Sequence, residues 1–241
     1  YEEVFKRISR LANALESLGV EVGDRVGVLS WNTHRLYELF FGVPGIGAVL
    51  LQMNLRLHPE DLAYVANHSG AKVIFVDESL IPIAEAIAPN IKAEKYVIMT
   101  DGELPETKLP NVYSYEELLK ERDDEYDFSM IDESSAYSAC YTSGTTGRPK
   151  GVYYSHRAIV LHSMIAAICL GLRADDVYIQ IVPMFHAQGW GVFFAATLVG
   201  AKLVFPGRYT ADNPKPLVDL MQSEKVTATA GAPAIFIPLL N

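Results

Sequence analysis

Apolar residues near the start of the chain recur at the spacing of an amphipathic helix. They fall three or four positions apart, and Gly19 stands where a C-terminal cap belongs; the apolar positions are Val4, Phe5, Ile8, Leu11, Ala12, Leu15 and Leu18. Side chains at this spacing share one face of a helix. The pattern predicts a helix that ends near Leu18 and buries that face.

Beyond this helix, short apolar segments alternate with helical patterns. The segments predict strands at residues 25–30, 48–53, 72–76, 96–99, 136–141, 151–154, 177–182, 202–205 and 227–230. Helices are predicted from Asn32 or Thr33 to 43, where Pro44 stops the helix, and at 59–68, 80–87, 115–121, 156–170, 190–199 and 214–223. This alternation is typical of an α/β fold with layered, largely parallel sheets and helices on both faces.

The acidic run at residues 121–127 interrupts the alternation. Clustered charges usually face water, so we interpret the run as a solvated linker, with metal binding as the alternative. It divides the chain into two α/β subdomains joined near residues 122–135.

Composition and charge narrow the class of protein. Half of the 241 residues are hydrophobic, and 20 basic against 29 acidic residues give a net charge of −9, which argues against a nucleic-acid-binding surface. Cys140 and Cys169 lie in apolar contexts without metal-ligand spacing, so we expect two reduced core thiols in a cytoplasmic protein. No signal peptide or transmembrane segment is predicted, which leaves peripheral membrane contact open.

The most informative segment is Tyr141–Gly151, which reads Y-T-S-G-T-T-G-R-P-K-G. Hydroxyl side chains and glycines gather in it and two cations follow; these residues are Thr142, Ser143, Gly144, Thr145, Thr146, Gly147, Arg148 and Lys150. Small residues let main-chain N–H groups converge on a polyanion, so the segment predicts a phosphate cradle. Its spacing differs from G-x-x-x-x-G-K-[ST], which excludes an ordinary P-loop. The alternative is a threonine-rich surface loop.

Two further segments follow predicted strands. His186 lies between a strand and a helix, where it could orient a carboxylate or phosphate, although a lone histidine is more often structural. Gly189 and Gly191 allow close approach beside it, and Trp190 offers an apolar wall. Gly231 and Ala232 end the last strand and either leave room for a ligand or form a simple turn. His68 and His162 have no partner spacing, and no G-x-S-x-G or G-x-G-x-x-G motif is present.

Together these segments resemble the adenylate-forming superfamily of acyl-CoA synthetases, luciferases and peptide-synthetase adenylation domains. Tyr141–Gly151 matches the signature Y-T-S-G-T-T-G-x-P-K-G at every defined position, and residues 183–190 match P-x-F-H with a downstream glycine. Residues 23–26 and 44–50 add support. The sequence F-H-A-Q-G-W, followed by residues 194–198, resembles the medium- and long-chain fatty acyl-CoA synthetase branch.

The resemblance implies a two-step reaction on a fatty acid with ATP, Mg²⁺ and CoA. A carboxylate attacks the α-phosphate of ATP and releases pyrophosphate, and the CoA thiol then displaces AMP. It assigns phosphate binding to Thr142, Ser143, Gly144, Thr145, Thr146, Gly147 and Lys150, and catalysis to His186, Lys150 and Thr142. Substrate binding falls to His186, to Trp190 as a gate of the acyl tunnel, and to Gly231 and Ala232 in the acyl pocket. No metal-ligating residue is expected.

The chain also departs from the family. Members are about twice as long, and the Y-G-x-T-E motif, the ribose-binding aspartate and the C-terminal lid domain with its lysine have no counterpart here. We therefore expect a partial N-terminal AMP-binding domain that is inactive alone. Two alternatives stay open: an aryl or amino acid adenylating enzyme, for which Asp176 and Asp212 are poorly placed as ammonium partners, and a non-catalytic nucleotide- or lipid-binding module. Acyl chain length and a homodimer are also open.

Overall fold

The computed structural model describes residues 1–128, 130–142, 147–209 and 213–237. It divides into two compact units, one formed by Tyr1–Ser30 with Arg35–His156 and the other by Trp31–His34 with Arg157–Asn241. The division follows strand β7, whereas the sequence placed the joint near residues 122–135. Strands β6 and β7 belong to the first unit because β6 pairs with β2.

The first unit is built on a sheet in the order β5-β4-β3-β1-β2-β6-β7. Its strands are β1 (Arg25–Leu29), β2 (Val49–Gln52), β3 (Ala71–Asp77), β4 (Lys95–Met99), β5 (Val112–Ser114), β6 (Ala136–Thr142) and β7 (Lys150–Ser155). All neighbouring strands are parallel except β6 and β7, which form an antiparallel pair. The largely parallel sheet predicted from the apolar segments is confirmed.

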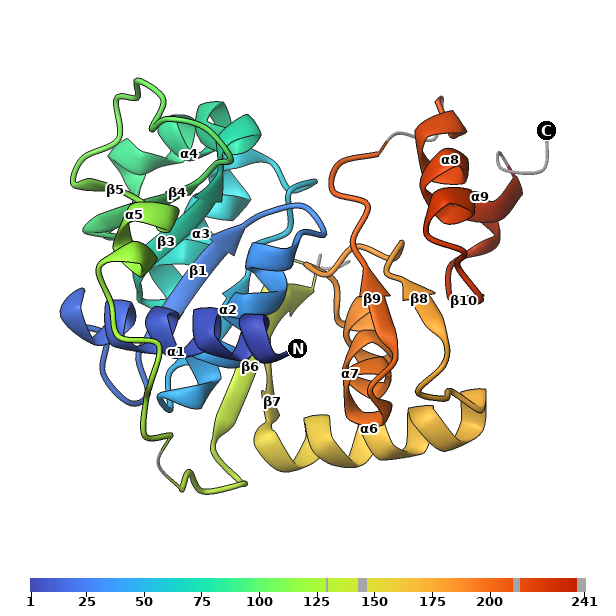
Figure 1. The fold of residues 1–241 in the computed structure, drawn as a ribbon. Helices are drawn as coiled ribbons and strands as arrows, with labels where there is room; N and C mark the ends of the chain where they lie inside the picture. Colours follow the sequence, from blue (N-terminus) through green and yellow to red (C-terminus); the bar gives the residue numbers. More distant parts are fainter. Residues whose placement is uncertain (129, 143–146, 210–212, 238–241) are drawn as a thin grey trace. The chain divides into compact units, whose positions relative to one another are not determined.

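Helices cover both faces of this sheet (Figure 1). They are α1 (Glu2–Ser17), α2 (His34–Gly45), α3 (Pro59–Ser69), α4 (Ile81–Ile87) and α5 (Tyr115–Lys120). Helices α1, α2 and α5 lie on one face and are joined through Arg7, whose Nε donates to Glu38 at 2.6 Å and whose Nη1 donates to Glu116 at 3.0 Å. Burial of strand side chains on both faces explains why the strands are continuous apolar runs.

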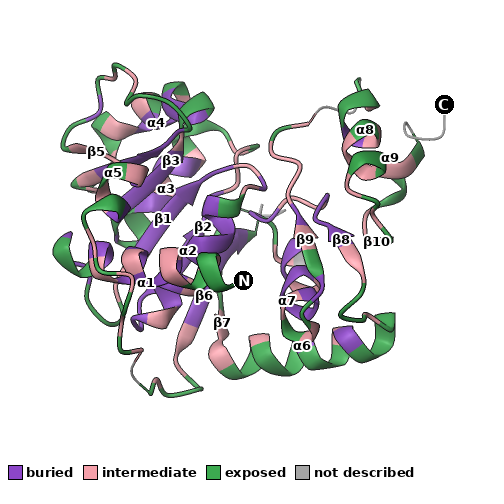
Figure 2. Ribbon diagram, in the orientation of Figure 1, coloured by how far each residue is buried: buried purple, intermediate pink, exposed green. Residues whose placement is uncertain are grey.

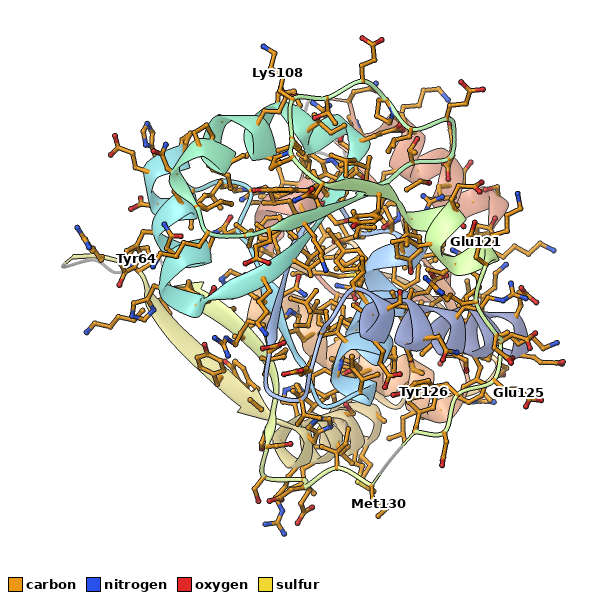
Figure 3. All side chains as sticks on the ribbon, turned by 90° about the vertical axis from the view of Figure 1, so that its left-hand side faces the viewer. Tyr64, Lys108, Glu121, Glu125, Tyr126 and Met130 are labelled. Atoms are coloured by element: carbon orange, nitrogen blue, oxygen red, sulfur yellow. The ribbon has the colours of Figure 1, made fainter. Side chains whose placement is uncertain are left out.

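The acidic segment packs along α1, contrary to the prediction of a solvated linker. The Asn13 side chain donates to the main-chain carbonyls of Asp123 and Glu125 at 3.1 and 3.0 Å, and the Tyr126 hydroxyl donates to Glu16 at 2.6 Å. Figure 3 shows Glu125 and Tyr126 on the segment that runs beside this helix. The Asp124 carboxylate also pairs with Arg10 of α1 at 3.5 Å, so the charge pattern alone did not reveal the packing.

The second unit contains a parallel sheet in the order β10-β8-β9. Its elements are β8 (Val177–Ile179), β9 (Lys202–Val204), β10 (Ala228–Thr229), α6 (His156–Leu170), α7 (Trp190–Val199), α8 (Lys215–Ser223) and α9 (Pro233–Phe236). Ile179, Ile181, Val204 and Leu217 form its buried cluster. The ends of α6 and α7 fall where the sequence predicted them, whereas β5 and α9 were not predicted.

Helix α6 is mostly exposed, whereas strands β1–β4 and β6 of the first sheet are mostly buried and β7 is mostly exposed (Figure 2). Cys140 on β6 is buried, but Cys169 on α6 is exposed, so the prediction of two core thiols is wrong for Cys169. Apolar residues occur on every side of α6, and such a sequence does not indicate which face is buried. Within the described residues, no helix combines the length and apolar character needed to cross a membrane.

Candidate functional site

Strands β6 and β7 frame the hydroxyl-rich loop of the first unit. Thr142, the last residue of β6, is the cross-strand partner of Lys150, the first residue of β7, and both are exposed. The antiparallel pairing therefore places a hydroxyl and an ammonium side by side at the base of the loop. Ser143, Gly144, Thr145 and Thr146, which complete the predicted phosphate cradle, lie outside the described residues.

The chain returns from this loop through Gly147 and Arg148. Gly147 has a φ of +153°, a backbone conformation that residues other than glycine rarely adopt. The Arg148 guanidinium lies over the Tyr64 ring at 5.1 Å from its centroid, a cation–π contact between the loop and α3. Figure 3 shows Tyr64 on α3. Arg148 therefore contacts a helix that the motif does not include.

A pocket of about 440 Å³ opens between α3 and the returning chain, lined by Tyr64, His68 and residues 147–151. His68 Nδ1 lies 2.8 Å from the Tyr141 hydroxyl, and burial raises the pKa of Tyr141 to about 12. Neither Tyr64 nor His68 is predicted as a site residue from the sequence. Their only signal was a spacing of four residues, which places both on the same face of a helix.

His186 lies on the segment that leads from β8 to α7 in the second unit. Its side chain is exposed, whereas the preceding residues Met184 and Phe185 are buried. The His186 N–H donates to the Pro183 carbonyl at 3.1 Å, and the His186 carbonyl accepts from the Gly189 N–H at 2.8 Å. The buried neighbours fix the turn and direct the imidazole toward solvent, as a group that meets a ligand requires.

Trp190 and Gly189 hold the C-terminal end of this segment. Trp190 is 3% exposed, and its Nε1 donates to the Met184 carbonyl at 2.7 Å. A Cβ on Gly189 would lie 2.4 Å from the Pro183 carbonyl oxygen, so the close approach expected of Gly189 is present. The same holds for Gly191, where a Cβ would meet the His162 ring. Residues 183–190 therefore form a compact turn on which His186 is exposed.

Gly231 and Ala232 follow β10, which pairs in parallel with β8. The pairing aligns Ala228 with Tyr178 and Thr229 with Ile179, so the chain leaves both strands at the same edge of the sheet. The structure thus brings the Gly231–Ala232 turn to the edge that carries the His186 segment. Carboxyl edges of parallel strands are where open α/β sheets collect ligands.

Of the two aspartates considered as ammonium partners, the structure describes Asp176. Asp176 accepts hydrogen bonds from the Thr227 hydroxyl at 2.7 Å and the Arg173 N–H at 2.9 Å, which lower its pKa. It closes a turn before β8, and Asp212 lies outside the described residues. Among the described residues, no group of three or more His, Cys, Asp and Glu side chains could hold a metal ion.

Strands β6 and β7 frame a glycine- and hydroxyl-rich segment in the first unit, and His186 follows a parallel strand in the second, as the resemblance to adenylate-forming α/β proteins implies. The comparison with protein families agrees, because the model described as AMP-binding enzyme matches residues 1–241. The chain belongs to the AMP-binding enzyme family.

Similar proteins include two fatty-acid ligases. The chain is 46% identical over 243 residues to a long-chain-fatty-acid–CoA ligase of Thermus thermophilus and 40% identical over 244 residues to a medium-chain-fatty-acid–CoA ligase of Ectopseudomonas oleovorans. Both alignments cover 100% of this chain but only 43% and 44% of the relatives, so the chain spans less than half of their length. Among solved structures, an anthranilate CoA ligase in complex with anthranoyl-AMP superposes with a TM-score of 0.89 at 26% identity, over 98% of this chain and 45% of that one.

Proposed function

We propose that this chain is part of a fatty acid–CoA ligase that activates a medium- or long-chain carboxylate. In the first step a carboxylate oxygen bonds to the α-phosphorus of ATP and pyrophosphate leaves. In the second step the CoA sulfur attacks the acyl carbon and AMP leaves. The pairing of Thr142 with Lys150 at the base of the loop carries the proposal, because it presents a hydroxyl and a cation where phosphates would enter.

The proposed roles follow from what each group can supply. Lys150 and the hydroxyls of the loop would neutralise charge that spreads over the phosphates, since phosphoryl transfer depends mainly on positioning and electrostatics. His186 would orient the carboxylate toward the phosphorus. Mg²⁺ favours oxygen ligands and keeps several waters, so it would be held largely by the ATP phosphates.

Fatty acids are favoured over aryl and amino acids as substrates. The two fatty-acid ligases are 46% and 40% identical to the chain, against 33% for a trans-cinnamate:CoA ligase of Petunia hybrida. An amino acid substrate needs a carboxylate for its ammonium group, and Asp176 is already held by Thr227 and the Arg173 N–H. A nucleotide- or lipid-binding module without catalysis remains the alternative from another class.

ATP–pyrophosphate exchange and CoA thioester formation test the proposal across saturated fatty acids of increasing length, benzoate and amino acids. We expect the whole protein that carries this chain to favour medium or long fatty acids and the 241-residue chain alone to show no exchange. Lys150→Ala should lower kcat by roughly 10²-fold, as loss of one charge-stabilising donor does. The control Lys120→Ala changes an exposed lysine of the same unit and should have no effect. A profile that favours aryl or amino acids, or equal effects of the two lysines, contradicts the proposal.

A further inference from the structure

Asn32 lies in the short connection between β1 and α2, yet it belongs to the second unit. The segment Trp31–His34 groups with residues 157–241, and Asn32 is 5% exposed. A short bridge pairs Asn32 with Gly207, whose N–H donates to the Asn32 carbonyl at 2.9 Å. A residue from the first part of the sequence is therefore built into the structure that carries His186.

The Asn32 amide makes hydrogen bonds through both of its polar atoms. Its Nδ2 donates to the carbonyls of Gln180 at 2.7 Å and Val182 at 2.9 Å. Its Oδ1 accepts from the Met184 N–H at 2.8 Å. A buried amide that uses donors and acceptor together holds its partners in one arrangement, because any shift leaves a buried polar group unpaired.

These partners flank the turn that carries His186. Gln180 and Val182 continue the chain from β8, and Met184 precedes His186 by two residues. The Met184 carbonyl in turn accepts from Trp190 Nε1 at the start of α7. The Asn32 amide thus fixes one end of the turn and Trp190 fixes the other.

Gln180 supports the same turn from within the strand extension. Its Nε2 donates to the carbonyls of Val182 at 2.7 Å and Gly189 at 3.0 Å. Val182 therefore accepts from two buried amides, one of which comes from a distant part of the sequence. Residues 180–190 are held by side chains where the ladder hydrogen bonds of the sheet end.

We propose that Asn32 is a positioning residue for adenylation, acting through residues 180–184 to place His186. The inference rests on the proposed function of His186. Aspartate has the shape of asparagine but, when ionised, cannot donate to Gln180 and Val182, and it brings a carboxylate close to two carbonyl oxygens. Asn32→Asp should therefore displace the turn without changing the volume of the side chain.

The test compares Asn32→Asp with Asn13→Asp in the whole protein. Asn13 is a matched control, because its Nδ2 also donates to two distant carbonyls, those of Asp123 and Glu125, but within the first unit. Asn32→Asp should lower kcat of ATP–pyrophosphate exchange by roughly 10- to 100-fold, as misplacement of a catalytic group does, with the KM for ATP changed less than about twofold. Asn13→Asp should leave both constants within about twofold.

Fluorescence provides a readout that does not depend on catalysis. This measurement uses the 241-residue chain, which contains two tryptophans, so that Trp31→Phe leaves Trp190 as its single tryptophan. Asn32→Asp should shift this emission to longer wavelength, because the buried Trp190 ring is tied to Met184. If Asn32→Asp does not fold, Asn32→Ser, whose hydroxyl retains one donor, is measured in the same way.

The outcomes separate the two proposals. If the unsubstituted whole protein exchanges pyrophosphate with no acid, the proposed function fails, and the Trp190 emission alone decides whether Asn32 holds the turn. A folded Asn32→Asp variant with unchanged kcat overturns the inference. So does an equal loss of kcat in Asn13→Asp, or a fall in kcat without a shift in Trp190 emission.

Discussion

Replacing Gly189 with alanine tests how tightly the turn before α7 is packed. Gly189 has φ −79° and ψ −12°, a conformation open to any residue. On backbone conformation alone, alanine should stabilise the protein by about 0.4–1 kcal/mol, because it reduces the entropy of the unfolded chain. The contacts around Gly189 predict the opposite, namely that alanine destabilises the protein.

The atoms that an alanine Cβ would meet at this position belong to the main chain, not to a side chain that could move aside. The new Cβ would lie 2.4 Å from the Pro183 oxygen and 3.2 Å from the Val182 oxygen. The Pro183 oxygen accepts from the His186 N–H, so it cannot retreat without moving the residue proposed to orient the carboxylate. Overpacking of this kind costs about 1–3 kcal/mol. With the middle of each range, a net loss of roughly 1.3 kcal/mol remains after the entropic gain.

Urea denaturation monitored by tryptophan fluorescence measures this loss of stability, because Trp31 and Trp190 both belong to the second unit. The midpoint should fall by roughly 0.5 M, given the slopes usual for urea. The kcat of exchange in the whole protein should fall roughly tenfold or more. Gly102→Ala is the control, since its Cβ would meet no atom closer than 3.8 Å. A Gly189→Ala variant as stable and active as the parent would refute the packing argument.

Three further predictions follow from the two units. Gly147→Ala forces a Cβ into a backbone conformation with φ +153° and should raise the KM for ATP in steady-state exchange, while the tryptophan-detected urea midpoint stays unchanged. His186→Ala should lower kcat of adenylation by roughly 10²- to 10³-fold with intact circular dichroism; an unchanged kcat would remove His186 from the mechanism. Burial raises the pKa of Glu116, but hydrogen bonds from Arg7 and Arg35 outweigh it and hold the pKa below 4.5. The stabilisation is therefore complete above that pH and is lost as the pH falls through the folded-state pKa, so the stability gap between the parent and Glu116→Gln should close on acidification in urea titrations.

The sequence predicted most of the fold because apolar periodicity reports burial directly. Helix α7 has the predicted ends because Trp190 follows a glycine-rich turn and Gly200 caps the helix in the left-handed conformation. The three-residue strand β5 was missed because its residues are only half-buried and show no apolar run. Helix α2 continues through Pro44 to Gly45, although a stop was predicted. A proline close to the end of a helix removes few hydrogen bonds, so the break predicted there does not occur.

The candidate site was harder to predict because the residues that hold its turns in place belong to no recognisable sequence motif. Residues 177–182 read as one strand, but β8 ends at Ile179. Beyond that point the carbonyls of Gln180 and Val182 accept from the Asn32 side chain. An asparagine before a helical pattern predicts an N-cap, and the sequence predicts that the helix starts at Asn32 or Thr33. Instead α2 begins at His34, and the Asn32 amide holds the turn before His186. Local sequence shows which polar residues could make hydrogen bonds, whereas their partners, 148–152 positions away, are set by the tertiary fold.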